Sequence, residues 1–151
     1  MLRSRLSEAL KEALKARDKR TVATVRLILA AVKDRDIAVR GNGSGDPISD
    51  DDILGLLQTM VRQRHESIAL FEKGGRKDLA DRERKEIEVV QRFLPAQLDE
   101  AEITSATKKA IEELGAAGLK DMGRVMGKLK SKYAGKMDFG KASSVAKELL
   151  V

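Results

Sequence analysis

The sequence has no cysteine and no tryptophan, and only three phenylalanines, one tyrosine and two prolines among its 151 residues. The lack of cysteine excludes disulfides, thiol catalysis and zinc sites with thiolate ligands. No stretch comes near the roughly 20 consecutive apolar residues that cross a bilayer as a helix. The segment from Met1 to Lys19 carries charges throughout, unlike a signal peptide. We therefore expect a cytoplasmic protein with no membrane insertion.

What the sequence does contain favours helices. Charged residues make up 36% of the chain and aromatic residues 3%, while alanine, leucine, lysine, glutamate and arginine are frequent. This composition is typical of all-α proteins. The formal net charge of +6 and the pI near 9.6 favour polyanionic partners.

Apolar periodicity and capping signals divide the chain into helices and two domains. Residues 1–95 are predicted to form an N-terminal helical domain, and residues 96–151 a small three-helix domain. In the N-terminal domain, the first helix is expected to end near Ala16 and the second to run from Thr21 to about Arg40. A long helical hairpin is expected from Asp50 to Phe93, with a corner at Gly74-Gly75. A linker is expected between Gly41 and Pro47. The C-terminal helices are expected from Asp99 to about Leu114, within Leu119–Asp138, and from Phe139 to Leu150.

The antiparallel hairpin predicts ion pairs between its arms. Counting outward from the glycine corner places Arg62 level with Glu83 or Glu86, and Glu66 level with Arg82. We expect these pairs to be structural and weak where they are exposed.

The stretch Leu119–Asp138 is the most polarised segment of the chain. An apolar stripe at helical spacing predicts a packed face made of Met122, Val125, Met126, Leu129 and Tyr133. Cations follow at four-residue steps beside it, at Lys120, Arg124, Lys128 and Lys132, and Lys136 comes after Gly135. Gly123 and Gly127 lie one turn apart and allow another backbone to come close, and Gly135 ends the helix.

Two interpretations of this stretch remain open. In the first, RNA phosphates contact the cations, a sugar-phosphate backbone approaches the glycines, and Tyr133 stacks on a base. In the second, the lysines are a solvated face and Gly135-Lys136 is a plain helix cap.

No catalytic group, metal site or cofactor site is predicted. Glutamine hydrolysis needs an activated nucleophile, and the chain has neither a cysteine nor a recognisable Ser-Lys arrangement. Activation of a carboxyl group by ATP needs a phosphate cradle, which is absent. The single histidine, His65, lies beside the apolar stripe of its helix and is expected to be partly buried and structural.

Several residue strings together resemble the YqeY-like family over essentially the whole chain. They are Arg62-Gln63-Arg64, Glu66-Ser67, Phe71, Gly74-Gly75-Arg76, Asp78-Leu79-Ala80, Glu83, Glu86-Ile87, Phe93-Leu94-Pro95, Met122-Gly123, Val125-Met126, Gly135-Lys136 and Asp138. The family's tail domain is similar to the C-terminal tail of the B subunit of glutamine-dependent tRNA amidotransferase. The resemblance implies a helical module that contacts tRNA, while amide transfer occurs elsewhere.

Three functions are therefore compatible with the sequence. The first is binding of tRNA or another RNA, with an aminoacylation or amidotransferase component as a further partner. The second is a carbon–nitrogen ligase with glutamine as amide donor, which the family link suggests and which this chain would serve only as an accessory. The third is a protein-interaction adaptor with no nucleic-acid role, docking a partner helix on the hairpin or near Gly123 and Gly127.

Overall fold

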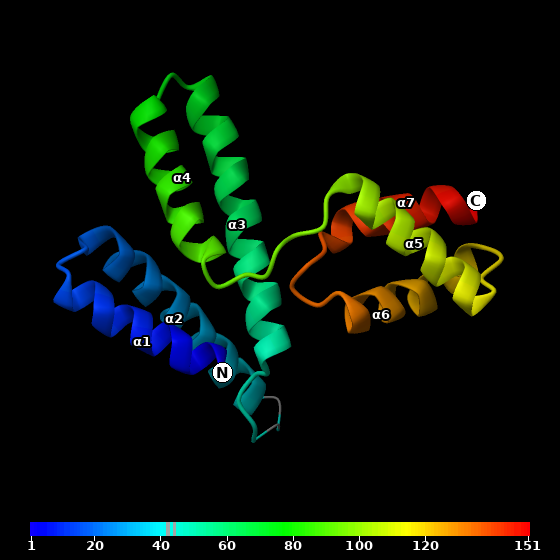
Figure 1. The fold of residues 1–151 in the computed structure, drawn as a ribbon, viewed down its shortest axis with the longest axis horizontal. Helices are drawn as coiled ribbons and strands as arrows, with labels where there is room; N and C mark the ends of the chain where they lie inside the picture. Colours follow the sequence, from blue (N-terminus) through cyan, green and yellow to red (C-terminus); the bar gives the residue numbers. More distant parts are fainter. Residues whose placement is uncertain (42, 44) are drawn as a thin grey trace. The chain divides into compact units, whose positions relative to one another are not determined.

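The computed structural model describes residues 1–41, 43 and 45–151, so Asn42 and Ser44 of the expected linker lie outside the described residues. Every regular element within these ranges is a helix, which confirms the all-α fold (Figure 1). The chain divides into two compact units, Met1–Leu94 and Pro95–Val151.

The N-terminal unit contains two antiparallel helical hairpins (Figure 1). The first pairs α1 with α2 and the second pairs α3 with α4, and their bounds are α1 Leu2–Lys15, α2 Lys19–Gly41, α3 Asp50–Lys73 and α4 Lys77–Gln91. The core is formed where these helices meet, and its fully buried members include Leu6, Val25, Ile28, Ile53 and Leu57. A smaller apolar cluster of Ile68, Ala80 and Ile87 continues along the α3–α4 hairpin.

Local signals explain where the helices begin. Asp18 accepts hydrogen bonds from the backbone N–H and the hydroxyl of Thr21, at 3.1 and 2.6 Å, and so caps α2. Ser49 and Asp52 form a reciprocal capping box at the start of α3. These caps satisfy N–H groups that have no partner within the helix.

A partly buried ion pair holds three parts of the N-terminal unit together. The two terminal guanidinium nitrogens of Arg3 on α1, Nη1 and Nη2, donate to the carboxylate of Asp36 on α2, each at 2.8 Å. Asp36 also accepts a bond from the backbone N–H of Ile48 at 2.9 Å, and Arg3 donates to the carbonyl of Ile48 at 3.0 Å. The segment before α3 is thereby joined to the first hairpin.

The C-terminal unit is a three-helix arrangement of α5, α6 and α7, with a short 3₁₀ turn before α6. Their bounds are α5 Glu100–Leu114, η1 Leu119–Asp121, α6 Met122–Lys132 and α7 Phe139–Leu150. Each helix packs against the other two around Ile103, Val125, Leu129, Met137 and Ala146. Asp99 and Glu102 form a reciprocal capping box at the start of α5. No helix among the described residues has the length and apolar content needed to cross a membrane.

Candidate nucleic-acid interface

The core side of α6 is the side that the sequence predicted. Val125 and Leu129 are fully buried, and Met122, Met126 and Tyr133 pack against the same core from its margin. Because these residues face α5 and α7, the cations between them are directed to the sides and outer face of α6. The structure therefore presents the basic residues of this helix at the surface of the C-terminal unit.

Arg124 is engaged within the protein. One guanidinium nitrogen lies 3.1 Å from Oδ1 of Asp121, and the other donates to the carbonyl of Leu114 at 3.2 Å. Asp121 is buried, and its pKa is lowered chiefly by a hydrogen bond from the backbone N–H of Ala117, with a further contribution from Arg124. Asp121 and Arg124 therefore secure the turn between α5 and α6.

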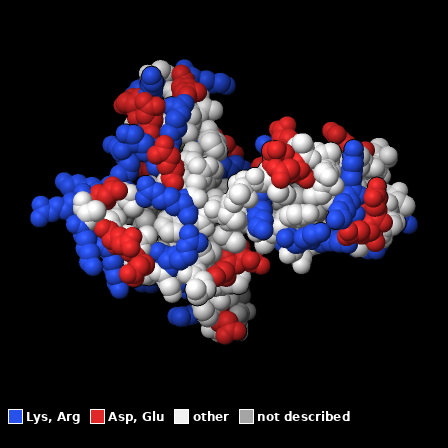
Figure 2. Space-filling model, viewed as in Figure 1, with Lys and Arg blue, Asp and Glu red and all other residues white. Residues whose placement is uncertain are grey.

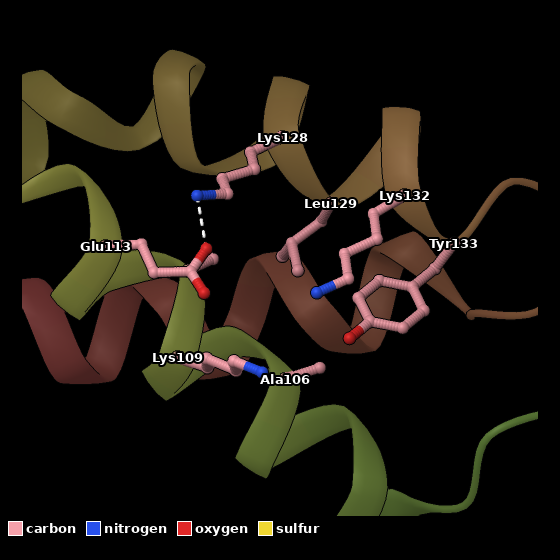
Figure 3. A pocket seen from close by; sticks show the side chains of 8 residues that line it. Ala106, Lys109, Glu113, Lys128, Leu129, Lys132 and Tyr133 are labelled. Atoms are coloured by element: carbon pink, nitrogen blue, oxygen red, sulfur yellow. Dashed lines mark ion pairs between the residues drawn. The ribbon is translucent and has the colours of Figure 1, made fainter.

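Lys128 is also engaged, because it forms an ion pair with Glu113 on α5 (Figure 3). Hydrogen bonding to Lys128 is the main reason that the pKa of Glu113 is lowered, and the charges of Lys132 and Lys109 lower it further. The charges of three lysines from two helices thus act on one carboxylate, and the net charge of these four groups is positive.

These side chains line a shallow notch between α5 and α6. Its lining consists of Ala106, Lys109, Ala110, Glu113, Lys128, Leu129, Lys132 and Tyr133. In Figure 3, Lys132 of α6 lies beside the Tyr133 ring, and Lys109 extends from α5 below Glu113. The amine of Lys132 is 5.6 Å from the centroid of that ring, a cation–π distance. Lys109 was not among the predicted residues, because sequence spacing does not reveal which face of α5 meets α6.

The outer face of α6 is smooth and open. Gly123, Gly127 and Ser131 follow each other at four-residue steps and are all exposed. A Cβ atom added at Gly123 or Gly127 would meet nothing within 4 Å, so these glycines do not serve packing inside the chain. Lys130 is exposed on the same helix, and Lys120 is exposed on the 3₁₀ turn before it. On the face of this unit seen in Figure 2, Lys and Arg side chains form a band over α6.

Gly135 has a different role from the other two glycines. It is buried and adopts a φ of 76°, a left-handed conformation that favours glycine. Its carbonyl accepts a bond from the Gln97 side chain at 2.6 Å, and the Lys136 carbonyl accepts one from the backbone N–H of Leu98 at 2.8 Å. The close approach at Gly135 is thus made by this chain, whereas the side chain of Lys136 is exposed.

The cross-hairpin ion pairs use a different arginine from the one predicted. Arg64, not Arg62, approaches Glu86 at 3.0 Å and Glu83 at 3.9 Å. Counting from the corner gives the level along the hairpin but not the direction around the helix, and two residues correspond to a rotation of about 200°. In the described part of the chain, Arg62, Glu66 and Arg82 form no salt bridge, although the charge of Arg82 acts on Glu83.

Two further features of the α3–α4 hairpin differ from the sequence-based expectation. A second cross-hairpin pair joins Arg84 and Glu72. His65 is exposed, which corrects the expectation that it is partly buried.

Comparison with known proteins gives one family match. The family described as Yqey-like protein matches residues 3–150. The chain is 33% identical over 112 residues to the altered inheritance of mitochondria protein 41, mitochondrial, of Lachancea thermotolerans, covering 72% of this chain and 57% of that protein. It is 29% identical over 136 residues to the protein of the same name from Pyrenophora tritici-repentis, covering 87% and 71%. An uncharacterised protein of Schizosaccharomyces pombe is 28% identical over 95 residues, covering 62% and 72%.

Proposed function

The chain belongs to the YqeY-like family, and on that premise we propose that its C-terminal unit binds RNA through the basic face of α5 and α6. The observation that carries the proposal is the gathering of Lys109, Lys128 and Lys132 around Glu113 and Tyr133, next to the open glycine face of α6. Phosphate contacts require cations more than a fixed spacing, and a smooth helix face lets a sugar-phosphate backbone lie close.

Each group has a role in this proposal. Lys109, Lys120, Lys132 and Lys136 contact phosphates, since none of them forms a salt bridge among the described residues. Tyr133, which is half-buried, offers its ring to a base. Arg124 and Lys128 hold the surface in shape through Asp121 and Glu113 and add positive potential.

Transfer RNA is the RNA class that we propose. Support comes from the resemblance noted in the sequence, in which the family's tail domain is similar to the tail of the amidotransferase B subunit, because that resemblance implies a module that contacts tRNA. In this proposal the amide transfer takes place in another protein. Glutaminase or amidation activity of the purified chain alone would contradict it.

The compartment is less narrowly defined than the sequence predicted. The names of two of the relatives above include the word mitochondrial, and the chain spans about 60–70% of the length of those proteins. The proposed RNA binding therefore requires only an aqueous compartment that contains RNA, and the cytoplasm is one such compartment.

The test is a titration of tRNA at several salt concentrations. Four phosphate contacts give a slope of log affinity against log salt of roughly −3 to −4. The variant K109A/K120A/K132A/K136A should lose most of this slope and most of the affinity while keeping its helicity, because alanine is the better helix former.

A matched variant removes the same charge from the N-terminal unit, at exposed lysines Lys11, Lys15, Lys73 and Lys85. It should bind nearly as the wild type does. Equal losses in the two variants would mean that the attraction reflects net charge alone. Binding that does not depend on salt, or no binding near physiological salt, would reject the RNA function in favour of the protein adaptor.

A further inference from the structure

Helix α2 is apolar on two opposite sides. Val25, Ile28 and Val32 are buried in the core of the N-terminal unit. A step of two residues turns a helix by about 200°, so Leu27, Ala30 and Asp34 point away from that core. Together with Ala23 and Ile37 they form a row at alternating steps of four and three residues, which we call the outer seam.

The outer seam is exposed and has the pattern of a helix-packing surface. Leu27 is 49% exposed and Ile37 is 55% exposed, and both alanines are exposed as well. Alternating steps of four and three residues are the spacing of a heptad seam. The small side chains of Ala23 and Ala30 leave hollows beside Leu27 that a partner's side chains can fill. A lipid surface fits this row poorly, because Asp34 interrupts it and it contains only two large apolar residues.

A row of cations runs along one flank of the outer seam. Arg26, Lys33 and Arg40 are spaced by seven residues, so they lie on the same side of the helix. All three are exposed, and none forms a salt bridge within the described part of the chain. Flanking positions of this kind determine the partner in paired helices through their charges.

The charges argue against a second copy of this chain as the partner. In an antiparallel pair of α2 helices, the basic flank of one copy faces the basic flank of the other. In a parallel pair, Asp34 of each copy faces Asp34 of its mate. Like charges brought together in this way are destabilising, and they select against such pairing.

We propose that the outer seam of α2 docks an amphipathic helix of another protein, one that carries Asp or Glu residues beside its apolar stripe. The acidic residues would pair with Arg26, Lys33 and Arg40, and the stripe would cover Leu27 and Ile37. This surface lies in the N-terminal unit, so the proposal does not depend on RNA binding by the C-terminal unit.

The test uses the full chain and two synthetic three-heptad peptides with leucine at the seam positions. One peptide carries glutamate at the flanks and the other carries lysine. Fluorescence anisotropy should show the glutamate peptide binding in the micromolar range and the lysine peptide binding at least about tenfold more weakly. The variant L27Q/I37Q should lose binding, whereas L70Q should not, because Leu70 is 69% exposed on α3 and outside the seam.

The variant R26E/K33E/R40E should reverse the preference between the two peptides, which a change in folding alone would not do. Circular dichroism melts should match the wild type, since all the altered side chains are exposed. Equal binding of both peptides, or no binding up to about 100 µM, would overturn the proposal. So would self-association of the chain in sedimentation, or retention on phosphatidylglycerol vesicles, if L27Q/I37Q abolishes it.

Discussion

Single residues of α6 separate the stability of the C-terminal unit from its proposed function. Gly123 and Gly127 weaken the helix because glycine loses more backbone freedom on folding than alanine does. Nothing in the chain occupies the space beside them. If RNA lies across this face, the methyl groups that alanine would add at these two positions interfere with the ligand and not with the fold.

We therefore expect G123A/G127A to raise the free energy of unfolding by up to about 1 kcal/mol per substitution. The same variant should bind tRNA several-fold more weakly. Urea unfolding and the tRNA titration provide the two measurements. The exposed substitution S105A on α5 serves as a control that raises the free energy of unfolding by only about 0.5 kcal/mol and leaves the tRNA affinity unchanged. A stabilised variant with unaltered tRNA affinity would place the RNA away from the glycine face.

The α3–α4 hairpin is held by Arg64, which lies between the carboxylates of Glu83 and Glu86. The pKa of Glu83 is raised, first by burial and then by the nearby charge of Glu86, and Arg64 opposes this rise. The side chains of Arg64, Glu83 and Glu86 are 15%, 22% and 21% exposed, so their charges are only partly screened.

Replacing Arg64 by alanine should lower the free energy of unfolding by roughly 1–2 kcal/mol, between the values for exposed and buried pairs. R62A is the matched control, because Arg62 is exposed and unpaired in salt bridges among the described residues; it should change the stability by less than about 0.5 kcal/mol. Chemical denaturation at pH 7 measures both. Equal effects would favour the pairing predicted from the sequence.

At the scale of the whole molecule, acid should weaken the N-terminal unit through one carboxylate. Hydrogen bonds from Arg3 and from the backbone of Ile48 lower the pKa of Asp36 from 3.8 to about 2. A lowered pKa means that the folded state favours the ionised form. The stabilisation is fully present above about pH 4 and is lost as the pH falls through about 2.

Wild type should therefore be more stable than D36N at pH 7, and the difference should shrink between pH 4 and pH 2. Urea midpoints measured across this range test the expectation. D34N, a change at an exposed carboxylate on the same helix, should show no such narrowing. A constant difference between wild type and D36N would mean that Asp36 acts through its shape and not through its charge.

Local patterns in the sequence are enough to place the helices and the side of α6 that packs. Helical periodicity and caps such as Ser49 with Asp52, or Asp99 with Glu102, involve residues within one turn of each other, so they can be recognised without knowing the fold. The burial of Val125 and Leu129 follows from the same local spacing.

The charges that meet across helices could not be read from these local patterns. The pairing of Arg64 with Glu86, the presence of Lys109 and Lys132 in one notch, and the ion pair of Lys128 with Glu113 depend on how different helices are rotated against each other. The basic face proposed for RNA thus differs from the predicted one in its members, although α6 remains its centre. The exposure of Leu27 and Ile37 was decided in the same way, because α2 packs with one apolar side and leaves the other uncovered within its unit.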